Sequence, residues 1–324
     1  KTFVELIGGV VILWAGGVSV MNGDMTIGAL ITFNSLLAYF LDPVKNLVDL
    51  QPQMQTAVVA ADRLGEILDL EAEKKENEQR KMAPESLAGD IKFEHVNFRY
   101  GTRQLVLEDI DFTIKKGEKI AFVGESGSGK STIASLILNN SKVTNGEIRV
   151  NDTNIENISL DNIYGNIALV STNSYIFNGT ILDNLLMAKK DASEEEINNA
   201  LKTARLYDFV KGLKDGLLTD VGQAGSALSG GQKQRLALAR VILADRPMII
   251  FDEATSNIDV ESEESIWEAI YELSKDKTIL VISHRLANVT EAKNIYVMNK
   301  GILVENGTHD ELMKKNGFYA DLYN

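Results

Sequence analysis

The sequence predicts an α/β fold with a mainly parallel sheet, preceded by two helices that cross a membrane. Short apolar strands alternate with helical stretches in the larger, C-terminal part of the chain, which is typical of parallel sheets buried on both faces. A glycine-rich motif of the phosphate-binding type stands between one of these strands and the next helix. Two long apolar segments with few charges come before this region.

Residues 1–70 are expected to form the end of a membrane domain. Residues 3–21 and 25–41 are mainly apolar, and each segment is about long enough to cross the hydrocarbon core of a bilayer. Lys1 and Lys45 flank the pair, whereas the turn between them holds only an acid, so both ends are predicted to be cytoplasmic. Helical spacing of apolar residues predicts that the second helix continues to residue 70. The alternative is a buried helical hairpin of a soluble domain.

Composition narrows the possible functions. The net charge of −13 over 324 residues argues against a general affinity for nucleic acid, and the absence of cysteine removes disulfide and thiolate chemistry. The chain begins with Lys1, and two spans cannot enclose a substrate path, so we expect it to be part of a longer protein. Residues 71–89 are highly charged without apolar periodicity and predict a linker, which leaves residues 90–324 as the second domain.

The second domain opens with a strand whose pattern has one ambiguity. Ile91, Phe93 and Phe98 alternate as in a half-buried strand, but either His95 or Val96 could be the inward residue between them. Further strands are expected at 110–114, 120–123, 248–251, 279–282 and 295–298, and a helix is expected at 132–139.

A phosphate-binding loop follows the strand at 120–123. Its glycines let backbone N–H groups face phosphate oxygens at a helix N-terminus, where negative charge is favoured. Lys130 is expected to reach the β- and γ-phosphates, and the hydroxyl of Ser131 to ligate Mg²⁺. The predicted nucleotide-binding residues here are Gly124, Glu125, Ser126, Gly127, Ser128, Gly129, Lys130, Ser131 and Thr132.

Two acids follow the apolar strand at 248–251. Asp252 would stand at the carboxyl end of this strand, where it could hold Mg²⁺ through water. Glu253 is placed to act as the general base toward an attacking water. A strand ending in two surface acids is common, so the prediction depends on the phosphate loop.

The pentapeptide at 228–232 points to a family. Its residues, expected to open a helix and to contact nucleotide, are Leu228, Ser229, Gly230, Gly231 and Gln232. Because this pentapeptide follows the phosphate-binding loop in the sequence, the chain resembles the ATP-binding-cassette (ABC) superfamily. The resemblance implies a cassette with a β subdomain and a helical subdomain that carries the signature. It also implies a second half-transporter, identical or different, because the signature of one subunit closes over the γ-phosphate held by the other.

The resemblance assigns three more residues. Tyr100 stands where the family has an aromatic that stacks on adenine, although it could be a core residue at a strand end. His284 resembles the switch histidine that contacts γ-phosphate and holds Glu253. Asp259 resembles the last acid of a loop that crosses the dimer interface. His95 and His309 match no functional position and are expected to be structural.

The chain departs from the family at two places. Thr172 stands where the loop that couples nucleotide to the membrane domain normally has Gln, and its shorter side chain puts direct ligation of Mg²⁺ in doubt. Residues 221–225 read Val-Gly-Gln-Ala-Gly where exporters have Gly-Glu-Arg-Gly, so the charges thought to sense the membrane domain are absent.

Together these features predict an ATPase, with ATP and Mg²⁺ as cofactors, that powers export as part of a dimer. The order of membrane segment and cassette on one chain resembles exporters, which implies a multi-pass protein of the cytoplasmic membrane with its cassette in the cytoplasm. The membrane segment resembles peptide and bacteriocin exporters, whereas residues 170–175 and 253–259 resemble thiol and cysteine exporters. A soluble cassette ATPase and an ATP-gated switch with little hydrolysis remain as alternatives of a different class.

Overall fold

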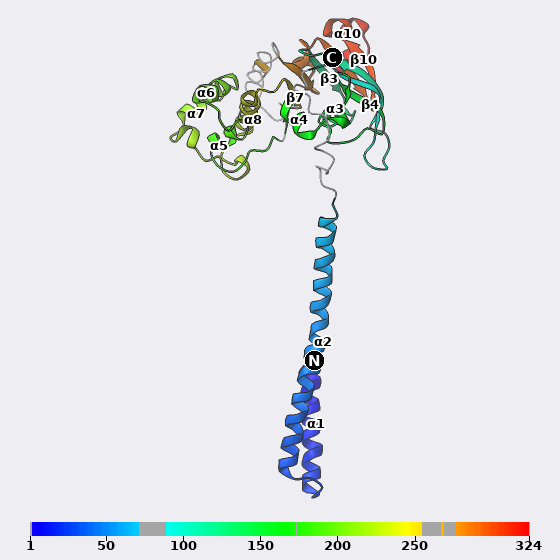
Figure 1. Cartoon of the computed structure of the whole chain (residues 1–324), viewed down its shortest axis with the longest axis vertical. Helices are drawn as coiled ribbons and strands as arrows, with labels where there is room; N and C mark the ends of the chain where they lie inside the picture. Colours follow the sequence, from blue (N-terminus) through cyan, green and yellow to red (C-terminus); the bar gives the residue numbers. More distant parts are fainter. Residues whose placement is uncertain (1, 71–88, 173, 255–266, 269–276, 324) are drawn as a thin grey trace. The chain divides into compact units, whose positions relative to one another are not determined.

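The computed structural model describes residues 2–70, 89–172, 174–254, 267–268 and 277–323. The chain divides into two units, residues 1–75 and 76–324 (Figure 1). Nearly all of the predicted linker, residues 71–88, lies outside the described residues.

The first unit is a pair of helices, α1 (Thr2–Met21) and α2 (Ile27–Leu68), as predicted. The turn between them uses Gly23 at φ +81°, a left-handed conformation that glycine adopts without steric cost. The hydroxyl of Thr26 caps α2 by accepting a hydrogen bond of 3.2 Å from the backbone N–H of Ala29. The continuation of the second helix past the apolar segment is also confirmed.

Gly16 of α1 lets the two helices approach closely. A Cβ atom on Gly16 would collide with the side chain of Leu30, whereas Gly8, Gly9 and Gly17 have no such neighbour within 4 Å. Most large apolar side chains of this unit are exposed. Among the described residues, α2 is the one helix long and apolar enough to cross a membrane, and residues 6–21 form a shorter apolar helix.

The second unit contains two sheets, as the predicted fold class requires. The six-stranded sheet has the order β10-β9-β3-β8-β7-β6, in which only the β10–β9 pair is antiparallel. Its strands are β3 (Lys119–Gly124), β6 (Ile167–Ser171), β7 (Met248–Asp252), β8 (Thr278–Ile282), β9 (Asn294–Asn299) and β10 (Ile302–Gly307). The antiparallel four-stranded sheet has the order β2-β1-β4-β5, built from β1 (Ile91–Phe98), β2 (Leu107–Ile114), β4 (Asn145–Val150) and β5 (Thr153–Asn154).

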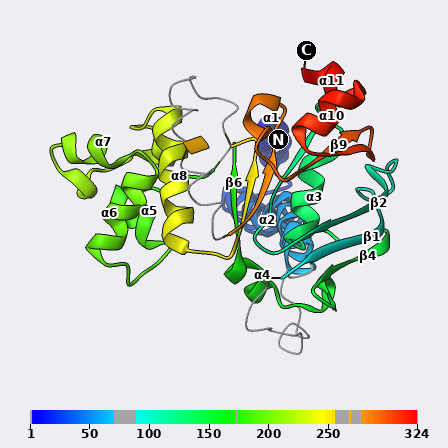
Figure 2. The same cartoon turned by 90° about the horizontal axis from the view of Figure 1, so that it is seen from above.

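The helices of this unit fall into groups (Figures 1 and 2). Helices α5 (Ile181–Leu186), α6 (Glu194–Thr203), α7 (Tyr207–Gly212) and α8 (Gly230–Ala244) gather on the β6 side and form the predicted helical subdomain. Helix α3 (Lys130–Ile137) follows β3, and α4 (Leu160–Asn166) precedes β6. Helices α10 (His309–Lys315) and α11 (Phe318–Tyr323) end the chain.

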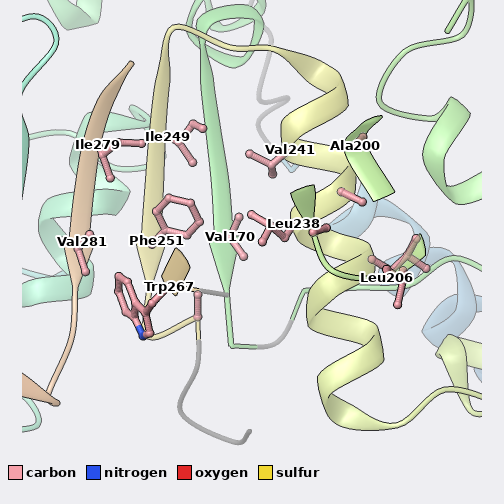
Figure 3. Close-up of a cluster of buried hydrophobic side chains, with 14 of the residues drawn as sticks. Val170, Ala200, Leu206, Leu238, Val241, Ile249, Phe251, Trp267, Ile279 and Val281 are labelled. Atoms are coloured by element: carbon pink, nitrogen blue, oxygen red, sulfur yellow. The ribbon is translucent and has the colours of Figure 1, made fainter. Parts of the chain in front are cut away.

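Alternate residues of the parallel strands supply two separate cores. In β3, Ala121 and Val123 belong to a cluster shared with α5–α8, and Figure 3 shows part of this cluster around Phe251. Ile120 and Phe122 face the other way, into a cluster shared with α3 and the four-stranded sheet. The central sheet is therefore buried on both faces, which explains the fully apolar runs in the sequence.

Strand β1 resolves the ambiguity between His95 and Val96. The register with β2 shifts between Phe93 and Val96, as in a β-bulge, and His95 has φ +50°. Val96 is therefore fully buried, whereas His95 is exposed and its Nδ1 lies 2.8 Å from Oδ1 of Asp109. This ion pair raises the pKa of His95. Nδ1 of His309 forms a hydrogen bond of 2.8 Å with the hydroxyl of the buried Tyr319.

Candidate functional site

The site lies at one edge of the six-stranded sheet, where several strands end. Asp252 at the end of β7 is paired with Ser171 at the end of β6 and with Ile282 at the end of β8. Gly124 ends β3 on the far side of β8. Carboxyl ends of parallel strands share one edge, which is the usual place for ligands in α/β folds.

A cavity of about 410 Å³ opens at this edge and contains much of the predicted site. The lining residues predicted from sequence are Ser126, Gly127, Gly129, Lys130, Ser131, Thr132, Thr172, Asp252 and Glu253. Val106 and Ser171 also line it and were not predicted as site residues. No motif marks Val106, which stands just before β2, and Ser171 reaches the cavity because of its pairing with Asp252.

The backbone of the phosphate-binding loop requires its glycines. Gly124, Gly127 and Gly129 have φ values of +146°, +81° and +101°, which L side chains rarely adopt. A Cβ atom on Gly124 would also collide with the carbonyl oxygen of Met298 on β9. Gly129 is the N-cap of α3, so the N-terminal N–H groups of that helix face the cavity side of the loop.

The side chain of Lys130 is held against this loop by carbonyl oxygens of the loop backbone. Its ammonium donates to the carbonyl oxygens of Gly124 at 2.8 Å and Glu125 at 2.7 Å, and to Oγ of Ser128 at 3.3 Å. Only 4% of the residue is exposed, and this burial lowers its pKa. The loop thus holds a cation at the cavity wall, where it can meet phosphate oxygens.

Ser131 and Asp252 meet across the cavity although 121 positions separate them in sequence. The hydroxyl of Ser131 donates to Oδ1 of Asp252 at 2.9 Å. Burial raises the pKa of Asp252, while the hydrogen bond from Ser131 opposes that rise. A hydroxyl and a carboxylate are oxygen donors of the kind that Mg²⁺ takes, so this pair fits the predicted metal.

Glu253 and His284 also come together, from the residues that follow β7 and β8. Nδ1 of His284 lies 3.7 Å from Oε1 of Glu253. Glu253 has a left-handed backbone at φ +49°, and its N–H donates to the carbonyl of Ile282 at 2.9 Å. A carboxylate in this position can accept a proton from a water in the cavity.

Thr172 contacts Glu253 through the backbone of the acid. The Thr172 hydroxyl donates to the carbonyl oxygen of Glu253 at 2.8 Å. The residue lines the cavity, as predicted, but this contact directs its hydroxyl toward Glu253.

Tyr100 lies beside the end of the phosphate-binding loop. Its hydroxyl is 3.5 Å from Oγ1 of Thr132, and its ring meets the edge of Phe98 with centroids 4.8 Å apart. Tyr100 is 45% exposed, so a face of its ring remains open to a planar ligand.

The predicted signature, residues 228–232, does not line the cavity of its own chain. Leu228 is buried, and Ser229 is the N-cap of α8, where its hydroxyl accepts from the N–H of Gln232 at 3.3 Å. Gln232 returns the bond from the Ser229 N–H at 2.8 Å, which completes a capping box. None of residues 228–232 is among the lining residues of the cavity. Asp259 lies outside the described residues.

The segment at 221–225 carries no charged side chain of its own and is held through its backbone. Gly222 and Gly225 have positive φ values, and the N–H of Ala224 donates to Oδ1 of Asn178 at 2.9 Å. Lys233 of α8 donates to the carbonyl of Ala224 at 3.2 Å.

Comparison with known proteins agrees with this geometry. Residues 107–256 match the family described as ABC transporter. A mesentericin transport/processing ATP-binding protein from Leuconostoc mesenteroides is 39% identical over 100% of this chain and 45% of its own length. An ATP-dependent lipid A-core flippase from Mannheimia succiniciproducens is 41% identical over 94% of this chain and 52% of its own length.

A solved structure is similar as well. The structure of a bacterial Atm1-family ABC exporter with ATP bound has a TM-score of 0.77 and 29% identity, covering 93% of this chain and 53% of that one. The chain thus spans about half the length of the relatives it matches. With its phosphate-binding loop, its two sheets and its helical subdomain, the chain carries an ABC transporter domain, matched over residues 107–256.

Proposed function

We propose that the chain binds ATP with Mg²⁺ and hydrolyses it to drive export through a membrane, as one half of a dimeric ABC exporter. The observation that carries this proposal is one cavity lined by Lys130, by the hydrogen-bonded pair Ser131–Asp252 and by Glu253. His284 stands beside Glu253, with its Nδ1 3.7 Å from Oε1 of the acid. These groups supply a cation for phosphate, oxygen ligands for a metal, and a base for water.

Nucleotide binding uses the loop and Tyr100. The N–H groups at the start of α3 and the ammonium of Lys130 face the phosphates, while the ring of Tyr100 packs on adenine. Ser131 and Asp252 would hold Mg²⁺, which would neutralise phosphate charge.

Hydrolysis relies on Glu253 as the base. The oxygen of a water forms a bond to the γ-phosphorus while the bond from that phosphorus to the ADP oxygen breaks, and Glu253 takes the water proton. His284 keeps the Glu253 carboxylate oriented, since their side chains lie 3.7 Å apart. Because this base is present, an ATP-gated switch with little hydrolysis is the less favoured function.

A second subunit would complete the site. Ser229 and the start of α8 form an anion-binding helix terminus that is absent from the cavity of its own chain. We therefore place them over the γ-phosphate bound by the partner, with Asp259 at the same interface.

The helical hairpin supports a place in the cytoplasmic membrane. Trp14 and Phe40 are 73% and 69% exposed, and such large apolar surfaces need lipid or further transmembrane helices to cover them. This exposure argues against both a soluble cassette and the buried hairpin of a soluble domain.

The proposed substrate is a peptide of the bacteriocin type. The relative named for mesentericin transport aligns over the whole chain, including both helices. The lipid A-core flippase is slightly more identical, at 41% against 39%, but aligns over 94% of the chain, so a lipid is the second candidate. A thiol or amino acid is the third.

Phosphate release from ATP in lipid vesicles tests the function. We expect Mg²⁺-dependent turnover that Lys130→Ala abolishes and that Lys116→Ala leaves unchanged, since Lys116 is an exposed lysine in the turn before β3, at the end opposite the phosphate-binding loop. ATP-driven uptake of a labelled bacteriocin precursor into inside-out vesicles, compared with lipid A and cysteine, tests the substrate. Equal phosphate release by the two lysine variants would refute the assigned site.

A further inference from the structure

We infer that Thr172 is a positioning residue for the base Glu253, and that its hydroxyl acts on the backbone of the acid instead of on the metal. This inference rests on the proposed function and adds a role for the residue at which the chain departs from its family.

Sheet register brings the two residues together. Ser171 pairs with Asp252 in the parallel ladder of β6 and β7, so the next residue on each strand, Thr172 and Glu253, leaves the sheet at the same level. The Thr172 hydroxyl then donates to the Glu253 carbonyl oxygen at 2.8 Å, across 81 positions of sequence.

Glu253 has a backbone that needs such support. Its φ of +49° lies in the left-handed region, which non-glycine residues occupy only when their surroundings hold them there. Its N–H is fixed on one side by the carbonyl of Ile282 at 2.9 Å. Thr172 fixes its carbonyl on the other side, so both backbone polar atoms of the base are held, one by each neighbouring strand end.

The direction of the side chain depends on this backbone. The left-handed turn at Glu253 sets where its Cα–Cβ bond points, and Oε1 is 3.7 Å from Nδ1 of His284 in this arrangement. Without the hydrogen bond from Thr172, the Glu253 carboxylate would still be present as a base. It would, however, sample a wider range of orientations relative to the attacking water. The effect should therefore appear in kcat and not in ATP affinity.

The decisive comparison is Thr172→Val, which keeps the shape and removes the hydroxyl, against Thr172→Ser, which keeps the hydroxyl. In lipid vesicles we expect Thr172→Val to lower kcat roughly five- to tenfold, the scale of one hydrogen bond, with the ATP KM and the half-saturating Mg²⁺ concentration within about twofold. Thr172→Ser should retain kcat within about twofold. Thr172→Ala provides a second loss of the hydroxyl if the valine variant does not fold.

A double-mutant cycle separates positioning from general damage. In a Glu253→Gln background there is no base to orient, so adding Thr172→Val should leave the residual single-turnover rate unchanged. An equal further loss in that background, unchanged kcat in the valine and alanine variants, or a raised Mg²⁺ requirement with kcat restored at high Mg²⁺ would each overturn the inference. Absence of wild-type hydrolysis would instead refute the proposed function itself.

Discussion

Glu253→Gln should abolish turnover while leaving both the fold and ATP binding intact. The amide has nearly the shape of the carboxylate, and the two backbone bonds of residue 253, to Ile282 and from Thr172, do not involve the side chain. The Glu253 and His284 side chains are 35% and 47% exposed and 3.7 Å apart, so their ion pair adds at most about 1 kcal/mol of stability. The melting temperature should therefore fall by no more than about 4 °C.

Loss of the base has a far larger effect on rate. Removing a positioned general base costs about 10²-fold to 10⁴-fold, which corresponds to roughly 2.7–5.4 kcal/mol of barrier. The activity loss thus exceeds the stability effect by about 2–4 kcal/mol, and the two can be distinguished. Single-turnover phosphate release measures the first, and equilibrium ATP binding together with thermal melting measures the second.

A matched control removes the effect of charge alone. Glu108→Gln makes the same substitution at an exposed position of β2, and it should keep the wild-type rate within about twofold, as surface substitutions usually do. Turnover of Glu253→Gln within tenfold of wild type, with normal ATP affinity, would show that another group activates the water.

Three further predictions concern the loop, the signature and the coupling position. A mixture of Lys130→Ala and Ser229→Arg chains should recover hydrolysis that each variant alone lacks, since one of the two sites in the mixed dimer then carries no substitution. Mixed dimers that are verified but inactive would contradict a site built from Lys130 of one chain and Ser229 of the other. Gly124→Ala should weaken ATP binding about tenfold or more through backbone strain, as measured by equilibrium binding. The control Gly165→Ala, whose added Cβ meets no neighbour within 4 Å, should leave the ATP affinity unchanged. Thr172→Gln should change basal hydrolysis by less than about tenfold, roughly 1.4 kcal/mol, and change substrate stimulation by a larger factor. A much larger loss of basal turnover with normal stimulation would contradict this prediction.

The parts of the fold that depend on local pattern were predictable from sequence. The run 120–123, the loop that follows it and the helix after that form one continuous unit, and the structure confirms β3 and α3 there. At His95 and Val96 the alternation was insufficient, because a bulge adds one residue to the strand and changes which side chain faces the core.

Contacts across the sheet were not predictable in the same way. The resemblance placed Thr172 at the usual position of a Gln and left its ligation of Mg²⁺ in doubt, but it gave no sign that the Thr172 hydroxyl contacts the backbone of Glu253. That contact exists because β6 is the neighbour of β7. Strand order is set by packing of the whole sheet and has no local signal in the sequence. Val106 lines the cavity for the same reason, since its neighbours come from distant elements.

The position of the catalytic groups relative to the sheet explains why this site can be both rigid and adjustable. Ser171, Asp252 and Ile282 are paired in one ladder, so they are fixed by the two cores on either side of the sheet. Thr172 and Glu253 stand one residue beyond that ladder, and Glu253 is held there by two backbone hydrogen bonds, to Ile282 and from Thr172. A change in the loop after β6 can therefore reach the base through one bond of 2.8 Å, without disturbing the residues that hold the phosphates.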